Sequence, residues 1–243
     1  MIVQYRFSVK EEGEIDVSFG YPLYGWLMEN APYEFAEAVH EQGETPVAQH
    51  LQYRGEAAYD WVVTLIGADA VTALSPVLDT AKEIALHNIT LSVTLEEKNV
   101  ITSAVSFIKQ VHAQEHGNRL NLIFRSPTSF KQNGRHVLFP QESLILQSLI
   151  TKWNTAFPEY PMDDRDAFAM LENGVRIVDY RLRSLRYPMK ATRITGFVGR
   201  VTLSARLSAP MQEIWNLLAA FAPYSGIGIK TALGMGGVSV EKI

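Results

Sequence analysis

Histidine is the residue type of this sequence best suited to acid–base chemistry near neutral pH. The chain contains six histidines and no cysteine. An unperturbed imidazole has a pKa of about 6.5, so it can donate or accept a proton near pH 7. The lack of cysteine excludes disulfides, thiolate nucleophiles and cysteine-ligated zinc. Proton transfer by a histidine is therefore the first chemistry to consider.

Two of the histidines stand where a reaction could use them. His40 lies near the end of a predicted helix, where the helix dipole favours a protonated imidazole and hence a general acid. His50 lies on a predicted strand and is either a second proton-transfer group or an ordinary surface residue. His112 and His116 have the spacing of zinc ligands, but the glutamate expected beside the first of them is absent. We therefore expect no metal site and no cofactor.

Glycines cluster in the segment 225–237. Five of the 16 glycines of the protein fall there, with Lys230 at the centre of the cluster. Glycine permits positive φ angles and a close approach of the backbone to a ligand, and successive amides can hold an anion. A dinucleotide-binding fingerprint is excluded, because Thr231 stands in place of its third glycine and the segment joins a helix to a strand. Two interpretations stay open: an anion-binding loop, or a tight turn that packs the last strand.

Charge is divided unevenly between the two halves of the chain. The net charge is −4, but residues 1–118 carry 6 basic and 17 acidic side chains, whereas residues 119–243 carry 16 and 9. Eight of the basic side chains lie between Arg176 and Arg206, where Asp179 is the single acid. This pattern predicts a face of the second half that attracts a polyanion, or else a solvated basic face.

The elements that must position these residues follow one order twice. In the first half, hydrophobic spacing predicts a strand, a helix, two strands, a helix and a strand, at residues 2–9, 22–40, 47–53, 59–66, 69–86 and 88–95. The second half repeats this order at residues 119–125, 140–157, 175–187, 197–207, 210–221 and 238–243. A turn-rich loop at 126–136 and an acidic, helix-capable insert at 162–172 interrupt it.

A βαββαβ order is typical of a ferredoxin-like unit. We therefore predict an α+β protein of two tandem ferredoxin-like (RRM-like) domains, residues 1–97 and 119–243, joined by residues 98–118. The second domain would contain the glycine-rich loop 225–237.

Composition is that of an ordinary folded protein, with 47% hydrophobic and 20% charged residues. The first residues, Met1 to Phe7, alternate like a strand and lack the apolar run of a signal peptide. No apolar stretch reaches the length that a membrane span requires. We expect a cytoplasmic protein without a membrane partner.

Three stretches of the sequence resemble one known family. The first is the glycine pattern of the C-terminal loop, Gly226-x-Gly228 followed five residues later by Gly234-x-Gly236. The other two are residues 123–131 with the helix after Pro140, and the stretch from Leu27 to His40. They are similar to the RAMP superfamily, in particular to the CRISPR-associated repeat-processing endoribonucleases of the bacterial type III-like branch. The resemblance covers nearly the whole chain and implies two RRM-like folds.

The resemblance also implies a reaction. In the family, the 2′-hydroxyl of the RNA attacks the adjacent phosphorus and leaves a 2′,3′-cyclic phosphate and a 5′-hydroxyl, without a metal ion. His40 stands at the position of the catalytic histidine of the family, and Tyr24 matches a tyrosine that completes the site in some relatives. Residues 41–53 lack the lysine that some relatives have there. Lys230 or an arginine of the basic run would then stabilise the charge of the phosphorane.

The same resemblance implies RNA contacts and partners. RNA-binding residues are expected in the matching segments, at Arg125, Lys131, Arg135, Gly226, Gly228, Lys230, Gly234 and Gly236. The implied partner is CRISPR repeat RNA in a precursor transcript, with transient association with an effector complex and a homodimer as further expectations. Two alternatives stay open: a non-catalytic RNA-binding subunit of an effector complex with the same folds, and an unrelated nucleotide-binding protein that uses the glycine loop.

Overall fold

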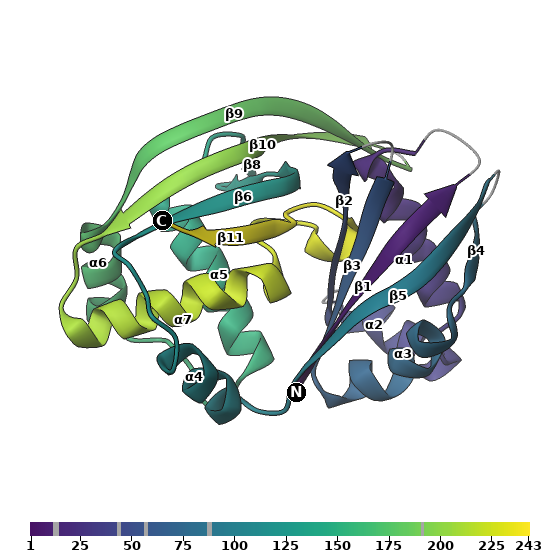
Figure 1. The fold of residues 1–243 in the computed structure, drawn as a ribbon, viewed down its shortest axis with the longest axis horizontal. Coiled ribbons are helices and arrows are strands. Elements are labelled where there is room, and N and C mark those ends of the chain that lie inside the picture. The colour runs from purple at the N-terminus through teal and green to yellow at the C-terminus, as the bar shows by residue number, and fades with distance from the viewer. Residues whose placement is uncertain (12–14, 43–44, 56–57, 87–88, 191) are drawn as a thin grey trace.

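Two antiparallel sheets stand side by side in the computed structural model, each with helices against one of its faces (Figure 1). The structure describes residues 1–11, 15–42, 45–55, 58–86, 89–190 and 192–243. The strand orders are β2-β3-β1-β5-β4 and β11-β6-β10-β9. In both sheets the first strand lies between the third and the last of the predicted βαββαβ order, as in a ferredoxin-like fold. The predicted α+β fold of two ferredoxin-like units is thereby confirmed.

The N-terminal unit extends from β1 to β5. Its elements are β1 (Ile2–Glu11), the 3₁₀ turn η1 (Val17–Phe19), α1 (Gly20–Glu29), α2 (Tyr33–Gln42), β2 (Val47–Gly55), β3 (Ala58–Ile66), α3 (Ala68–Thr80), β4 (Glu83–Leu86) and β5 (Ile89–Ile101). The prediction that the last helix continues to Leu86 is wrong, because residues 83–86 form an edge strand against β5. In that strand Ile84 and Leu86 are buried and alternate with exposed residues, which is the pattern of a strand and not of a helix.

The C-terminal unit extends from α4 to β11. Its elements are α4 (Ala104–His112), β6 (Arg119–Thr128), β7 (Phe130–Gln132), β8 (Arg135–Val137), α5 (Glu142–Ala156), α6 (Arg165–Gly174), β9 (Val175–Met189), β10 (Thr192–Ala205), α7 (Ala209–Ser225), the 3₁₀ turn η2 (Thr231–Leu233) and β11 (Val238–Lys242). The predicted loop at 126–136 contains a short hairpin, β7–β8, closed by Asn133 and Gly134, a turn pair that favours two-residue hairpins. The predicted insert at 162–172 includes most of α6.

The residues between the two predicted domains are divided between the two units. β5 continues past residue 97 to Ile101, and α4 packs Phe107 and Val111 into the core of the C-terminal unit. The division of the chain at residues 97 and 119 stays a hypothesis.

Aromatic side chains fill the space between each sheet and its helices. In the N-terminal unit, Phe7 stacks on Trp61 with ring centroids 5.5 Å apart. In the C-terminal unit, Trp153 packs against Phe157 and Phe221 at centroid distances of 4.6 and 5.4 Å. Full burial of a large apolar side chain contributes about 1.5–3 kcal/mol, so these cores stabilise the units on which the functional residues stand.

The two units meet where the open face of the first sheet contacts the end of α7 and the segment that follows it. Gln4 on β1 is buried, and its Nε2 donates to the carbonyl of Pro223 at 3.0 Å. His50 on β2 is also buried, with its ring against the backbone of Gly237. Burial lowers the pKa of His50 to about 4, although a hydrogen bond to Gln52 acts in the opposite direction.

The buried His50 predicts a loss of stability in mild acid. The unfolded chain takes up a proton at His50 near pH 6.5, whereas the folded protein does so only near pH 4. The stability that depends on neutral His50 is therefore complete above about pH 6.5 and is lost as the pH falls toward 4. Urea unfolding between pH 7 and pH 4.5 should show a steeper loss for wild type than for His50→Gln, which cannot titrate. Parallel losses in the two proteins would contradict the prediction.

Candidate active site and nucleic-acid interface

His40 and Tyr24 lie on neighbouring helices of the N-terminal unit. His40 is in the last turn of α2, and its side chain is exposed. Tyr24 is half-buried on α1, with its hydroxyl 3.4 Å from Thr45 Oγ1. Since Thr45 lies shortly after the end of α2, the Tyr24 side chain is in contact with the segment that follows the helix of His40. The predicted catalytic pair thus lies in one region of one unit, with His40 open to a ligand.

The glycine-rich loop, residues 225–237, has much of its backbone bonded within the protein. Ile227 N donates to Gly236 O at 2.9 Å, and Gly228 N donates to Ser148 Oγ at 2.8 Å. Gly236 N donates to Pro127 O at 3.0 Å. Amides that are already bonded cannot also hold an anion, so these contacts favour the interpretation of a tight turn that packs the last strand.

The exposed part of the loop is its edge at Gly228 and Lys230. Gly226, Gly234 and Gly236 are buried, whereas Gly228 is half-buried and Lys230 is exposed. Lys230 has a φ of 58°, in the left-handed region that residues with a side chain rarely adopt. Contact of RNA with this loop stays a prediction, and the edge at Gly228 and Lys230 is where a ligand has access.

A backbone contact joins this loop to the start of α1. A Cβ atom on Gly20 would lie 2.8 Å from Gly234 Cα and 2.9 Å from the Tyr187 hydroxyl. Gly234 itself has a φ of 99°, which favours glycine. The Tyr187 hydroxyl donates to the carbonyl of Leu233 at 2.6 Å, and burial raises its pKa, so it stays protonated. The loop of one unit therefore lies directly against the helix of the other unit that carries Tyr24.

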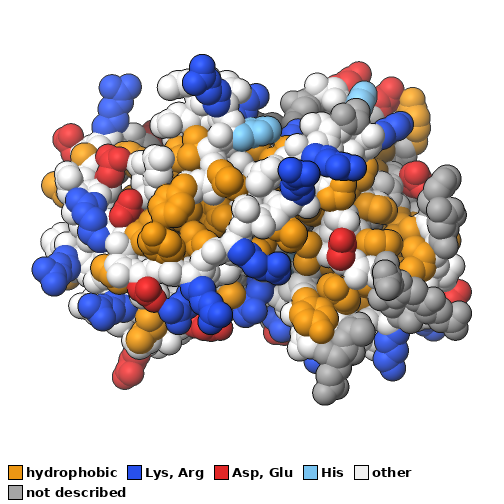
Figure 2. Space-filling model, turned by 90° about the horizontal axis from the view of Figure 1, so that it is seen from above, with side chains coloured by type: hydrophobic (Ala, Val, Ile, Leu, Met, Phe, Trp, Pro, Cys, Tyr) orange, Lys and Arg blue, Asp and Glu red, His pale blue; other side chains and the backbone are white. Residues whose placement is uncertain are grey.

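A groove between the two units is lined by arginines and tyrosines. Its basic side chains come from the open face of the second sheet: Arg125 on β6, Arg181 and Arg183 on β9, and Arg200 on β10. Tyr53 and Tyr59 line it from the first unit, with ring centroids 5.3 Å apart. Seen from above, Lys and Arg side chains are spread over the C-terminal unit and reach its junction with the N-terminal unit (Figure 2). This is the arrangement expected of a surface that binds a single-stranded nucleic acid.

Two of the groove arginines are engaged by neighbouring side chains. Arg125 Nε donates to Ser239 Oγ at 2.9 Å. Arg200 is paired with Asp179 at 2.7 Å. The predicted residues Lys131 and Arg135 lie elsewhere, exposed on the β7–β8 hairpin. The residues that are predicted to contact RNA therefore lie in three places: the groove, the β7–β8 hairpin and the glycine-rich loop.

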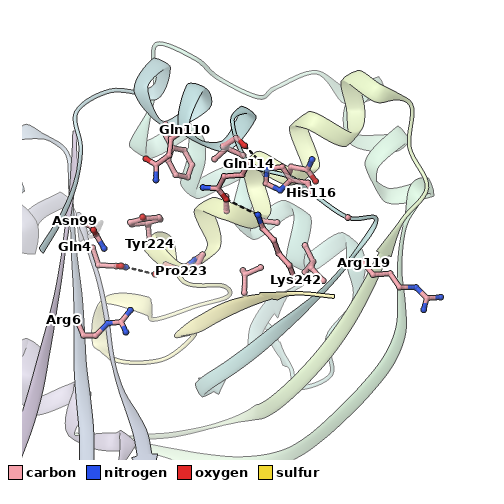
Figure 3. A pocket seen from close by; sticks show the side chains of 18 residues that line it. Gln4, Arg6, Asn99, Gln110, Gln114, His116, Arg119, Pro223, Tyr224 and Lys242 are labelled. Carbon is pink, nitrogen blue, oxygen red and sulfur yellow. Dashed lines mark hydrogen bonds between the residues drawn. The ribbon is translucent and has the colours of Figure 1, made fainter. Parts of the chain in front are cut away.

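A second hollow lies between the first sheet and helices α4 and α7 (Figure 3). Its cations are engaged or turned away: Arg6 pairs with Glu97 at 3.4 Å, Lys242 Nζ donates to Gln114 Oε1 at 3.1 Å, and Arg119 points outward. This hollow therefore offers less to a phosphate than the arginine groove does.

Comparison with known proteins gives one consistent result. The family model of CRISPR-associated endoribonuclease Cas6 matches residues 122–238. Over 221 residues the chain is 30% identical to a CRISPR-associated endoribonuclease Cas6 of Streptococcus thermophilus, covering 90% of each chain. The chain belongs to this family. The prediction that this chain is a RAMP-superfamily endoribonuclease is confirmed.

More distant relatives agree with this assignment. A CRISPR-associated endoribonuclease Cas6 of Mycobacterium tuberculosis is 27% identical over 232 residues, which cover 93% of this chain and 73% of the relative. A solved Cas6 product complex superimposes with a TM-score of 0.79 at 25% identity, covering 99% of this chain and 100% of that one. A RAMP protein that binds different RNA substrates superimposes with a TM-score of 0.61, over 99% of this chain and 100% of its own. Because the two sequences are only 14% identical, this similarity shows a shared fold alone.

Two other histidines, His50 and His116, offer less to the endoribonuclease chemistry than His40 does. His50 is buried, and its lowered pKa keeps it neutral at pH 7, which does not suit a general acid with access to a substrate. His116 Nε2 lies 2.8 Å from the carbonyl of Val111, and His87 is outside the described residues.

In the described part of the chain, no three His, Asp or Glu side chains are grouped so that they could hold a metal ion. No described helix is both long and apolar enough to span a membrane.

Sequence reasoning did not identify three residues of this region. Tyr53 and Tyr59 are direct partners across the β2–β3 hairpin, so two tyrosines at equivalent positions of a predicted hairpin were the available signal. Lys152 on α5 caps α7, since its Nζ donates to the carbonyls of Ser225 and Gly226 at 3.2 and 3.0 Å. Burial lowers the pKa of Lys152 to about 7. No local pattern indicates that contact, because its two partners lie in a later element.

The close approach of Gly20 and Gly234 predicts a sharp difference between two glycines of α1. Gly20→Ala should lower the melting temperature, because the added Cβ would lie 2.8 Å from the Gly234 backbone and 2.9 Å from the hydroxyl of the buried Tyr187. Gly25 has no atom within 4 Å of an added Cβ, so Gly25→Ala should be neutral or stabilise by up to about 1 kcal/mol through helix propensity. Thermal unfolding of the two variants tests this. Equal melting temperatures would show that the contact at Gly20 is loose.

Proposed function

We propose that this endoribonuclease cleaves CRISPR repeat RNA in precursor transcripts and releases mature guide RNAs. The observation that carries the proposal is the exposed His40 at the end of α2, in a chain that belongs to the Cas6 family. Attack of the RNA 2′-hydroxyl on the adjacent phosphorus would leave a 2′,3′-cyclic phosphate and a 5′-hydroxyl. The solved Cas6 product complex, at 25% identity, supports RNA as the ligand.

The reaction requires proton transfer and charge stabilisation. The 2′-hydroxyl must be deprotonated or aligned, the phosphorane charge stabilised, and the departing 5′-oxygen protonated. We assign proton transfer to His40 and alignment to the Tyr24 hydroxyl. The cation would come from Lys230 or from the groove arginines, since residues 41–53 contain no lysine.

We assign the bound RNA to the arginine groove. Guanidinium groups bind phosphates, and the paired rings of Tyr53 and Tyr59 offer a surface on which bases stack. Lys131, Arg135 and Lys230 are exposed and would extend the contact on either side. A non-catalytic RNA-binding subunit with the same folds is the alternative, and it would bind the RNA without cutting it. A cytoplasmic location, a homodimer and transient association with an effector complex stay expectations.

Substitution of His40 should separate cleavage from binding. His40→Ala should reduce the rate of repeat cleavage by about 10² to 10⁴, with affinity for the repeat within a few-fold of wild type, because a proton-transfer group acts mainly in the transition state. Gel analysis of labelled repeat RNA in excess EDTA gives both quantities. His112→Ala, at an exposed position on α4, is the control and should cleave normally. Full cleavage by His40→Ala would remove His40 from the mechanism, and activity that EDTA abolishes and a divalent ion restores would refute a metal-free reaction.

The groove residues should contribute to affinity in two distinguishable ways. Arg183→Ala should weaken binding and flatten the log–log salt dependence by about 0.7, the value for one phosphate of a single strand. Tyr53→Ala should weaken binding by about 1–3 kcal/mol without changing that slope, since stacking releases no counterions. A salt series of repeat-RNA affinities measures both, with Arg206→Ala, outside the groove, as the control. Unchanged affinity in both groove variants would show that the RNA binds to another surface of the protein.

A further inference from the structure

Gln49 is a buried glutamine whose side-chain amide is fully bonded. It lies on β2 and is 2% exposed. Its Oε1 accepts from Trp61 Nε1 at 2.9 Å, and its Nε2 donates to the carbonyls of Gly20 and Ala232 at 2.6 and 2.9 Å. Because an indole nitrogen can only donate, the oxygen of the amide must face Trp61 and the NH₂ group must face the two carbonyls. The orientation of the side chain is therefore determined.

The two carbonyls belong to different units. Gly20 is the first residue of α1, one helical turn before Tyr24. Ala232 lies in η2 of the glycine-rich loop. The neighbouring carbonyl, that of Leu233, accepts from the Tyr187 hydroxyl on β9. Two successive carbonyls of the loop are thus held, one by each unit.

The same turn of the loop contains its exposed cation. The carbonyl of Lys230 accepts from Leu233 N at 3.0 Å and from Met235 N at 3.3 Å. Lys230 therefore belongs to one bonded turn with Ala232, which Gln49 joins to Gly20. A continuous series of hydrogen bonds and backbone connects the exposed edge of the loop to the helix of Tyr24.

We propose that Gln49 is a positioning residue for RNA cleavage, which holds α1 and Tyr24 at a set distance from the Lys230 edge of the glycine-rich loop. The inference rests on the cleavage function proposed above. Gln49 is buried and therefore touches neither the RNA nor the reacting atoms, so its loss acts on the geometry of the site. A misplacement of about 1 Å can cost about 100-fold in rate, whereas phosphate contacts on exposed side chains tolerate such a shift.

Gln4 provides a matched control within the same interface. It is also a buried glutamine of the first sheet, and its Nε2 also donates across the units, to Pro223 O at 3.0 Å (Figure 3). The same Nε2 donates within the sheet to Thr64 Oγ1 at 3.0 Å. Pro223 lies in the last turn of α7, before the loop. Loss of Gln4 removes a contact between the units without releasing the loop from α1.

The test compares Gln49→Met with Gln4→Met, both of which remove the donors and keep the size of the side chain. Single-turnover cleavage of repeat RNA at saturating protein should be slower by about 10- to 100-fold for Gln49→Met, with its Kd within threefold of wild type. Gln4→Met should also lower the melting temperature, while its cleavage rate stays within threefold of wild type. Gln49→Glu keeps the acceptor for Trp61 and replaces the NH₂ group by a carboxyl oxygen, which can donate to at most one of the two carbonyls, so its rate should also be reduced.

An unchanged rate in folded Gln49→Met, or equal loss of rate in both methionine variants, would overturn the proposal. If Gln49→Met does not fold, Tyr187→Phe replaces it, since this change removes one hydroxyl from the neighbouring carbonyl and keeps the ring. A reduced rate with unchanged Kd in Tyr187→Phe supports positioning by the loop, and a normal rate overturns it. Absence of cleavage by wild type would instead refute the proposed function itself, so the two failures are distinguishable.

Discussion

The contact between Gly20 and Gly234 is the constraint on which the arrangement of the two units depends. Neither residue has a side chain, so the two backbones approach closely enough for Gln49 to bond to both segments with one NH₂ group. A larger residue at either position would separate the units, and with them the two walls of the arginine groove. The glycine pattern of the loop is thus explained first by packing. Gly234 lies against the other unit, whereas a Cβ on Gly226, Gly228 or Gly236 would meet atoms of the C-terminal unit itself.

Elements with a strong and local hydrophobic period could be predicted from the sequence. The spacing of Ile214, Leu218 and Phe221 predicts a helix after Pro210, and the structure has α7 there. Edge strands are harder to predict from the sequence. In a strand of four residues, such as Glu83–Leu86, the alternation of buried and exposed positions is too short to be distinguished from a continuation of the preceding helix. The β7–β8 hairpin is equally short, and its turn residues predict a loop as well as a hairpin.

The sequence was sufficient to predict which residues form the candidate site, but not which residues surround them in the fold. The place of His40 at a helix end follows from the local sequence, and its exposure agrees with a role in catalysis. The burial of His50 depends on Gly237, and the role of the loop amides depends on Ser148 and Pro127, all of which lie far away in the chain. Long-range contacts of this kind leave no periodic signal, which is why the loop was open to two interpretations.

The glycine-rich loop is synthesised after every segment that it contacts in the N-terminal unit. Translation proceeds from the N-terminus, and domains generally fold as units in that order. The first sheet can therefore complete its own core while Gln4 and His50 still face water and Gln49 is bonded only to Trp61 and Gly20 of its own unit. Their partners, Pro223, Ala232 and Gly237, arrive only when the ribosome has passed the loop. The order of segments along the chain thus delays assembly of the groove between the units until the end of α7 and the loop have emerged.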